Sequence, residues 1–302
     1  MKIIILGANS QLGQSIKKIS TKFPQLNLVF KTKQQLDLTQ RAKVQKFFKL
    51  ESYDGIINCA AYTDVDKAEE EKELANEVNH LAVENLAKIA KQHEIKLFQI
   101  STDYVFDGIS TEPYLETEET LEYTLDQSSM PVSLRTVSNQ PSFYGLTKLA
   151  GEKAIQQASP NNSVIIRTSW LYSEFGENFV KAISNKSETE QELKVVSDQT
   201  GSPTYAEDLA EVLLNLAQVH KSKSVEIYHY ANQGICNFNE FAKEIVKLEN
   251  KQTKIIKIKT TELNQKAKRP KYSALNTTKI KTKYKIKIPK WKNSLKKCLA
   301  CL

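Results

Sequence analysis

A tyrosine and a lysine four residues apart, Tyr144 and Lys148, form the strongest chemical pattern in this sequence. Side chains at this spacing share one face of a helix, and the surrounding stretch YGLTKLAGEKAIQQ has a helical pattern. A free phenol has a pKa of about 10, and a nearby ammonium lowers that pKa because it favours the phenolate. Such a tyrosine exchanges a proton with a substrate oxygen while hydride moves at carbon. Because the pair also occurs by chance on surface helices, it needs support from elsewhere in the chain.

Support comes from a hydroxyl pair at the end of an expected strand, Ser101 and Thr102 in the stretch IKLFQIST. A hydroxyl at a strand end can hold the same substrate oxygen that the tyrosine protonates. We therefore predict Tyr144 and Lys148, with a hydroxyl of the Ser101–Thr102 pair, as the catalytic group of an oxidoreductase.

The first residues, MKIIILGANSQLG, predict a strand that runs into a phosphate-binding turn. Gly7 and Gly13 are the first and last glycines of a dinucleotide fingerprint: Gly7 makes the tight turn, and Gly13 lets the helix pack on the strand. The middle position is Ser10. The absence of a glycine at this position matters only if position 10 needs a positive φ, which glycine alone adopts without strain. An ordinary strand-to-helix turn is the alternative interpretation.

Cations follow the second expected strand, NLVF, where the cofactor ribose should lie. An acid about 20 residues after the fingerprint binds the ribose of NAD, whereas a cation accepts the 2′-phosphate of NADP. Lys31 and Lys33 come first, and the first acid, Asp37, comes late. We therefore expect NADPH, with NADH left open. The alternative interpretation is that these lysines are ordinary surface residues rather than contacts of the 2′-phosphate.

The positions of these motifs depend on an alternation of strands and helices. Strands are expected at 3–6, 27–30, 55–59, 95–102 and 163–172, and helices at 14–21, 39–50, from 65 onwards and at 144–157. Repeated βαβ units predict an α/β fold, a Rossmann-type doubly wound parallel sheet with a smaller C-terminal substrate-binding region. We assign residues 1–170 to the dinucleotide-binding domain, with a long loop at about 112–142, and residues 171–302 mainly to substrate binding. In this second part helices are expected at 207–219 and 237–248, and a strand near 226–231 is expected to return to the sheet.

Bulk properties restrict the class of protein further. The chain has 302 residues, a net charge of +8 and four cysteines too scattered for a disulfide framework. No apolar run approaches the ~20 residues of a membrane span, so we expect a cytoplasmic protein without a membrane partner. The lysine-rich stretch 251–297 lacks the interleaved aromatics of a nucleic-acid site, so we interpret it as a solvated face beside an anionic substrate. We expect no metal site, because the histidines lack ligand spacing.

Several motifs together resemble one enzyme family. They are GANSQLG (7–13), NCAAYTDVDKAE (58–69), STDYVFDG (101–108), YGLTKLAGE (144–152), RTSWLY (167–172), SDQTGSPT (197–204) and RPKYSALN (269–276). In this order they resemble the extended short-chain dehydrogenases/reductases, and more closely the dTDP-4-dehydrorhamnose reductases. The resemblance covers nearly the whole chain.

The resemblance implies a reaction and a set of residues. Such enzymes reduce the 4-keto group of dTDP-4-dehydro-β-L-rhamnose with NAD(P)H, which gives dTDP-L-rhamnose for surface polysaccharide. By this likeness Tyr144 is the general acid, Lys148 is its partner and Thr102 binds the C4 oxygen. Substrate contacts are then expected from Thr102, Asp103, Trp170 and Arg269. The cofactor residues are expected to be Gly7, Ser10, Gln11, Leu12, Gly13, Lys31, Asp37, Leu38, Ala61, Tyr62, Thr63, Tyr144 and Lys148.

Three departures from the family pattern leave alternatives open. Ser10 replaces the usual glycine, and the connection between Gly108 and Tyr144 is longer than is usual, close to the expected sugar. Some members bridge two subunits through a metal held by glutamates, but Ser15 stands at one such position, so the metal is not carried over. A reductase of a related 4-keto-6-deoxy sugar nucleotide, giving a talose epimer or an N-acetylated deoxysugar, remains open. A non-catalytic nucleotide-sensing subunit like that of methionine adenosyltransferase is a second alternative, and a homodimer is also left open.

Overall fold

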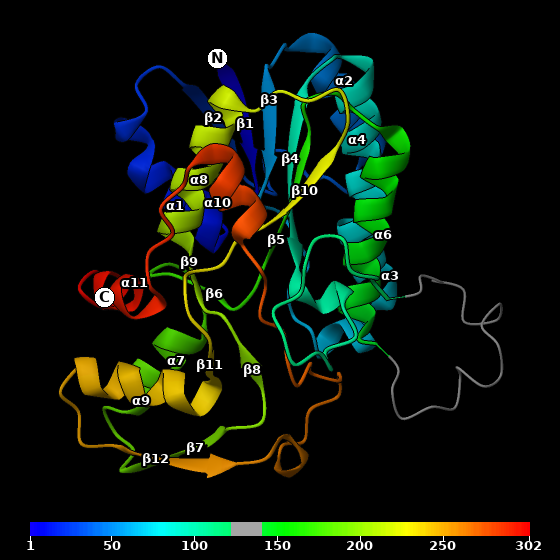
Figure 1. Cartoon of the computed structure of the whole chain (residues 1–302). Coiled ribbons are helices and arrows are strands. Elements are labelled where there is room, and N and C mark those ends of the chain that lie inside the picture. Colours follow the sequence, from blue (N-terminus) through cyan, green and yellow to red (C-terminus); the bar gives the residue numbers. More distant parts are fainter. Residues whose placement is uncertain (122–140) are drawn as a thin grey trace, which may run out of the picture.

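A six-stranded parallel sheet forms the centre of the computed structural model, which describes residues 1–121 and 141–302 (Figure 1). The strands are β1 (Lys2–Leu6), β2 (Asn27–Lys31), β3 (Gly55–Asn58), β4 (Lys96–Thr102), β5 (Val164–Thr168) and β10 (Glu226–His229). Their order across the sheet is β10-β5-β4-β3-β1-β2, and every pair is parallel. The order reverses between β1 and β3, where doubly wound sheets place their ligands.

Helices cover both faces of this sheet (Figure 1). One face carries α1 (Gln11–Ile19), α8 (Ala206–Val219) and α10 (Thr278–Tyr284). The other carries α2 (Arg41–Leu50), α4 (Ala82–Gln92) and α6 (Phe143–Ala158), with the short α3 (Lys72–Asn76) beside α6. Parallel strands with helices on both faces confirm the predicted α/β fold of the Rossmann type.

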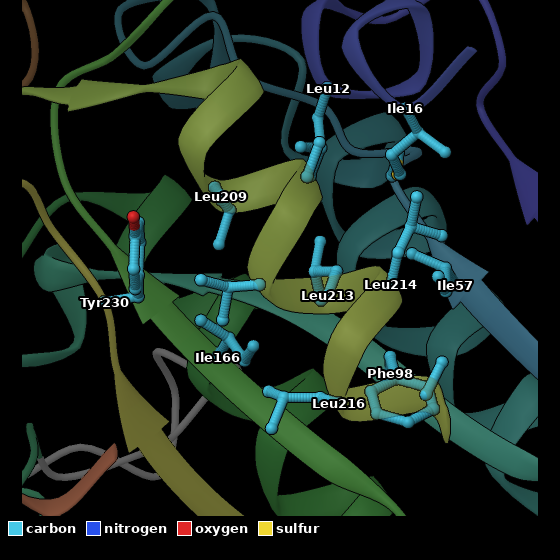
Figure 2. Close-up of a cluster of buried hydrophobic side chains, with 14 of the residues drawn as sticks. Leu12, Ile16, Ile57, Phe98, Ile166, Leu209, Leu213, Leu214, Leu216 and Tyr230 are labelled. Atoms are coloured by element: carbon cyan, nitrogen blue, oxygen red, sulfur yellow. The ribbon is translucent and has the colours of Figure 1, made fainter. Parts of the chain in front are cut away.

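The two cores follow from the alternation of side chains along β1. Ile3 and Ile5 point into the core under α1 and α8, whereas Ile4 and Leu6 point into the core under α2 and α4. All four are at most 1% exposed, as expected for a strand buried on both faces. Figure 2 shows the first core, where Leu12 and Ile16 of α1 and the leucines of α8 meet strand residues such as Ile57, Phe98 and Ile166.

A smaller region packs at the carboxyl edge of the sheet (Figure 1). Its helices enclose a separate core that includes Tyr172, Phe241 and Trp291. An Asn237–Glu240 capping box starts α9. The elements of this region are β6 (Leu171–Tyr172), α7 (Phe179–Lys186), β7 (Glu192–Val196), β8 (Thr200–Gly201), β9 (Thr204–Tyr205), β11 (Cys236–Asn237), α9 (Phe238–Leu248), β12 (Lys254–Ile258) and α11 (Trp291–Leu299).

The structure corrects two sequence predictions and adds elements that the sequence analysis did not predict. The strand predicted at 163–172 is broken after Thr168, because Trp170 adopts a φ of +47° and the chain turns into β6. The first helix starts at Gln11 rather than residue 14, because the Ser10 side chain caps it. The lysine-rich stretch 251–297 contains β12, α10 and most of α11, which periodicity did not reveal.

Two further findings concern the middle of the chain and the membrane prediction. Residues 122–140 of the predicted long loop lie outside the described part of the chain. Before them, the Tyr114 backbone N–H donates to the Ala274 carbonyl at 2.9 Å, and the Tyr114 ring stacks on Phe106. In the described residues, no helix has the length and apolar character to cross a membrane.

Candidate active site

A cleft of about 570 Å³ lies where the carboxyl ends of β1, β3 and β4 face the smaller region. A second cleft of about 310 Å³ adjoins it, and Ser10 and Ala61 line both. The first cleft brings together the predicted residues Ser10, Gln11, Leu12, Ala61, Thr63, Thr102, Asp103, Tyr144, Lys148 and Trp170. The second is lined by the predicted residues Gly7, Ser10, Asp37, Leu38, Ala61 and Tyr62.

Tyr144 reaches the first cleft from the first turn of α6. That helix starts at Ser142, whose Oγ accepts the Gly145 N–H at 3.1 Å. Thr102 lines the same cleft from the end of β4. Burial raises the pKa of Tyr144 above its ordinary value, and the neighbouring Thr102 side chain acts in the opposite direction. A phenol that keeps its proton is a proton donor, as a reduction requires.

Lys148 is 4% exposed and donates from Nζ to the Ile100 carbonyl at 2.6 Å. Burial lowers the pKa of Lys148 to about 8, and the negative charge of Glu152 one turn later raises it. The predicted lowering of the tyrosine pKa is therefore wrong for this structure. Burial of the phenol outweighs the other influences, and the Lys148 ammonium is directed at a backbone carbonyl.

Glu152 is itself held by a buried ion pair with Arg167 of β5. Arg167 Nε donates to Glu152 Oε1 at 3.0 Å, and Nη2 donates to Oε2 at 2.7 Å. The two side chains are 3% and 1% exposed, and Arg167 lies 5.0 Å from the centre of the Phe106 ring. A two-pronged bond of this kind fixes both side chains and the charge beside Lys148.

Asp103 and Trp170 contribute a buried carboxyl and an indole to the same cleft. Thr102 Oγ1 donates to Asp103 Oδ1 at 2.9 Å, and burial raises the pKa of Asp103 to about 6. The Trp170 ring stacks on Phe238 of α9 with 3.7 Å between ring centres. The left-handed backbone at Trp170 is rare for a bulky residue and is often found at functional sites.

The phosphate-binding turn has the geometry that its glycines imply. Gly7 has a φ of +73°, and a Cβ at Gly13 would lie 2.5 Å from the Gly7 carbonyl oxygen. Ser10 has a φ of −69°, so this position needs no glycine. Its Oγ accepts the Gly13 N–H at 3.1 Å as the cap of α1. The turn therefore forms without its middle glycine.

The two lysines after β2 lie in different places. Lys31 is the last residue of β2, and its Nζ lies 5.4 Å from the centre of the Phe47 ring, away from both clefts. Lys33 lines the second cleft together with Asp37. Burial raises the pKa of Asp37, but hydrogen bonds from Thr39 and the charge of Lys33 outweigh it and hold that pKa below its ordinary value. Lys33, rather than Lys31, is thus the cation at this end.

Arg269 lies next to the first cleft but does not line it. Its Nη2 donates to Asp66 Oδ2 at 2.6 Å, and its Nη1 donates to the Tyr104 hydroxyl at 3.2 Å. It borders a small cavity of about 80 Å³, and Tyr104 lines both this cavity and the first cleft. The guanidinium that was predicted to bind the substrate diphosphate is therefore bonded to the Asp66 carboxylate in this structure.

Asn79 holds the backbone of Tyr62, which lines the second cleft, and the sequence analysis did not single it out. It lies in a π-helical turn, Glu77–Leu81, and is 1% exposed. Its Oδ1 accepts the Tyr62 N–H at 2.9 Å, while its Nδ2 donates to the Tyr62 carbonyl at 3.0 Å and to Thr147 Oγ1 at 3.2 Å. Asn79 thus ties the loop after β3 to α6. An amide on the otherwise apolar face of a helical stretch is the signal that would have revealed it.

The cysteines and the side chains that could bind a metal ion were also located in the structure. All four cysteines are free, and Cys59, which lines both clefts, is a buried thiol whose pKa burial raises. Among residues 1–121 and 141–302, no three His, Cys, Asp or Glu side chains are grouped to hold a metal ion.

Comparison with known proteins places this geometry in a family. The model of the RmlD substrate binding domain matches residues 1–302. A dTDP-4-dehydrorhamnose reductase from Sinorhizobium fredii is 33% identical, and the match covers 100% of this chain and 98% of that protein. The chain belongs to the dTDP-4-dehydrorhamnose reductase family. A spore coat polysaccharide biosynthesis protein, SpsK of Bacillus subtilis, is 35% identical over 91% of this chain and 89% of its own length.

Solved structures of family members have the same architecture. A dTDP-4-dehydrorhamnose reductase from Clostridium acetobutylicum superposes with a TM-score of 0.88 at 39% identity over 99% of both chains. The enzyme from Bacillus anthracis, in complex with NADP, also gives 0.88, at 33% identity over 99% of this chain and 98% of that one. The family resemblance drawn from the sequence motifs is confirmed.

Proposed function

We propose that this chain reduces the 4-keto group of dTDP-4-dehydro-β-L-rhamnose with NADPH and so forms dTDP-L-rhamnose. The observation that carries the proposal is the meeting of Thr102, Tyr144 and Lys148 in one cleft at the point where the strand order reverses. The family supports the choice of sugar, because its named members are dTDP-4-dehydrorhamnose reductases. The bound NADP of the Bacillus anthracis relative supports the choice of cofactor.

The residues of the turn and of the second cleft fit a dinucleotide. Gln11 and Leu12 lie in the first turn of α1, where backbone N–H groups have no acceptor within the helix and favour a diphosphate. A Cβ at Gly7 would meet the Cys59–Ala60 backbone and a Cβ at Gly13 would meet the Gly7–Ala8 backbone, so the two glycines let α1 start close against the end of β1. Asp37, Leu38 and Tyr62 then face the adenosine end, with Lys33 beside the ribose 2′-phosphate. Bound in this way, NADPH supplies the hydride.

Each catalytic side chain has a defined task in this proposal. The Tyr144 hydroxyl donates its proton to the C4 oxygen as that oxygen gains electron density. Thr102, which lines the same cleft as Tyr144, holds the same oxygen through its hydroxyl. By the family resemblance Lys148 is the partner of Tyr144: its ammonium would have to turn from the Ile100 carbonyl toward the phenolate, whose negative charge it would then stabilise. Asp103 and Trp170 line the sugar side of the cleft.

The role in surface polysaccharide synthesis is supported by SpsK, a relative whose name places it in spore coat polysaccharide biosynthesis. An Arg269 contact with the substrate diphosphate requires the guanidinium to exchange Asp66 for phosphate oxygens, which it matches in geometry. The homodimer and the cytoplasmic location stay predictions.

A coupled assay tests the proposal. Purified protein is mixed with NADPH and dTDP-4-dehydro-β-L-rhamnose prepared enzymatically from dTDP-glucose, and the product is identified by NMR. We expect dTDP-L-rhamnose, and we expect Tyr144→Phe to lose about 10²–10⁴-fold in kcat. Tyr53→Phe is the control, because its hydroxyl binds Glu51 far from the cleft. Full activity of Tyr144→Phe would contradict the mechanism, and the talose epimer as the product would show that hydride reaches the other face of the same 4-keto sugar.

A further inference from the structure

The Gln11 side chain turns away from the phosphate-binding turn to which its backbone belongs. Its Oε1 accepts two hydrogen bonds, from Ser173 Oγ at 3.0 Å and from Asn178 Nδ2 at 2.9 Å. Both donors lie more than 160 residues later, in the connection between β6 and α7. The first residue of α1 is thus bonded to the substrate side of the cleft.

Residues 173–178, hereafter the 173–178 segment, form a compact loop. The Phe175 N–H donates to Ser173 Oγ at 3.1 Å, and Asn178 Nδ2 donates to the Ser173 carbonyl at 2.7 Å. Asn178 Oδ1 then caps α7 by accepting the Lys181 N–H at 3.2 Å. Gly176, Glu177 and Asn178 of the segment line the first cleft together with Phe179, the first residue of α7. The position of this wall therefore depends on where Asn178 is held.

A second contact holds the same segment against the same helix. Lys18 lies seven residues after Gln11, two turns along α1 and on the same face. Its Nζ pairs with Glu174, whose side chain is 7% exposed, and with Glu207 at 2.8 Å. The Tyr205 hydroxyl also donates to Glu174 Oε2 at 3.1 Å. The 173–178 segment is thus fixed along α1 at two points, of which only Gln11 touches the cleft.

We propose that Gln11 is a positioning residue that couples the cofactor turn to the sugar wall of the cleft. Its backbone belongs to the diphosphate site, while its side-chain oxygen seats the 173–178 segment and α7. Loss of the side-chain oxygen should therefore weaken binding of the sugar nucleotide more than binding of NADPH. This inference rests on the proposed function. It adds to the proposed site a residue whose side chain acts through the 173–178 segment.

Three variants separate this role from a cofactor contact. Gln11→Leu removes the acceptor, so the KM for the sugar nucleotide at saturating NADPH should rise about tenfold (~1.4 kcal/mol). Its Kd for NADPH should stay within about twofold. Gln11→Glu keeps an acceptor oxygen but adds a negative charge near the diphosphate, so the pattern should reverse. Gln14→Leu is the control, because Gln14 Nε2 donates to the Asn9 carbonyl at 3.0 Å and not to the 173–178 segment, so this variant should change neither constant.

Hydrogen exchange provides a readout that needs no turnover. In Gln11→Leu the Phe175 and Lys181 amides should exchange faster, while amides in the middle of α4 should be unchanged. Inactive wild-type protein would refute the proposed function and leave the exchange and NADPH measurements to decide the role of Gln11. Unchanged exchange at both amides, or a weaker NADPH Kd with an unchanged sugar KM in Gln11→Leu, would overturn the inference.

Discussion

The buried Glu152–Arg167 pair should be among the most sensitive points of the fold. Glu152→Gln keeps the shape of the side chain and one acceptor oxygen, but it leaves the Arg167 guanidinium, 3% exposed, without a counter-charge. Breaking such a pair costs ~3–5 kcal/mol, against a total stability of ~5–15 kcal/mol. We expect the unfolding free energy of Glu152→Gln to fall by about this amount.

Urea unfolding followed by circular dichroism measures this loss as a lower midpoint at unchanged slope. The double variant Glu152→Leu with Arg167→Met removes both charges and should recover most of the stability. A cost below ~1 kcal/mol for Glu152→Gln, or a double variant less stable than the single one, would refute the electrostatic reasoning.

The same substitution should alter the pH dependence through Lys148. Burial lowers the pKa of Lys148 to about 8 while Glu152 raises it, so the variant should have a still lower pKa. Because the proposed mechanism needs the ammonium, kcat/KM for reduction should decline as pH rises through this pKa. The decline should begin at lower pH in Glu152→Gln, and an unchanged profile would contradict the coupling.

Lys148 also links the stability of the wild-type protein to pH. Its folded pKa of about 8 is below the ordinary 10.5, so the unfolded chain binds more protons between these values. This group therefore destabilises the fold at neutral pH, and its contribution becomes more favourable as pH rises from about 8 to about 10.5.

Two further predictions concern the cofactor side. Because Ser10 caps α1, Ser10→Ala should lower the unfolding free energy by ~1 kcal/mol and Ser10→Gly by only a few tenths, as measured by urea unfolding. The KM for NADPH should change little in Ser10→Gly, and a large gain in affinity would show that the serine is a defect. Lys33→Glu should weaken NADPH binding by about tenfold or more while it leaves NADH binding nearly unchanged. Titrations of both cofactors measure this, with Lys31→Glu as the control. Equal losses for both cofactors would contradict a role for Lys33 at the 2′-phosphate.

Local patterns in the sequence predicted the architecture well. The run Ile3–Leu6 is buried on both faces, as an uninterrupted apolar strand implies, and GANSQLG forms a strand-to-helix turn. These features can be predicted from the sequence because the pattern of apolar residues in a strand and the geometry of a turn depend on residues that are close together in the chain. The helical spacing of Tyr144 and Lys148 was equally local, and the fold class followed from the alternation of strands and helices.

What only the tertiary structure decided involves partners distant in the chain. Sequence named both Lys31 and Lys33, but which of them lines the cofactor cleft depends on where β2 ends. The pKa of Tyr144 rises rather than falls, because burial by the surrounding elements outweighs effects that spacing suggests.

Gln11 illustrates the same limit most clearly. Its sequence position placed it in the phosphate turn, but its side-chain oxygen bonds to Ser173 and Asn178. A hydrogen bond between residues so far apart in the chain exists only after the sheet and the smaller region have packed together. The sequence by itself therefore determined the strands and helices of the sheet and the motifs that meet in the clefts, whereas the packing decided which side chains line the clefts and what each of them contacts there.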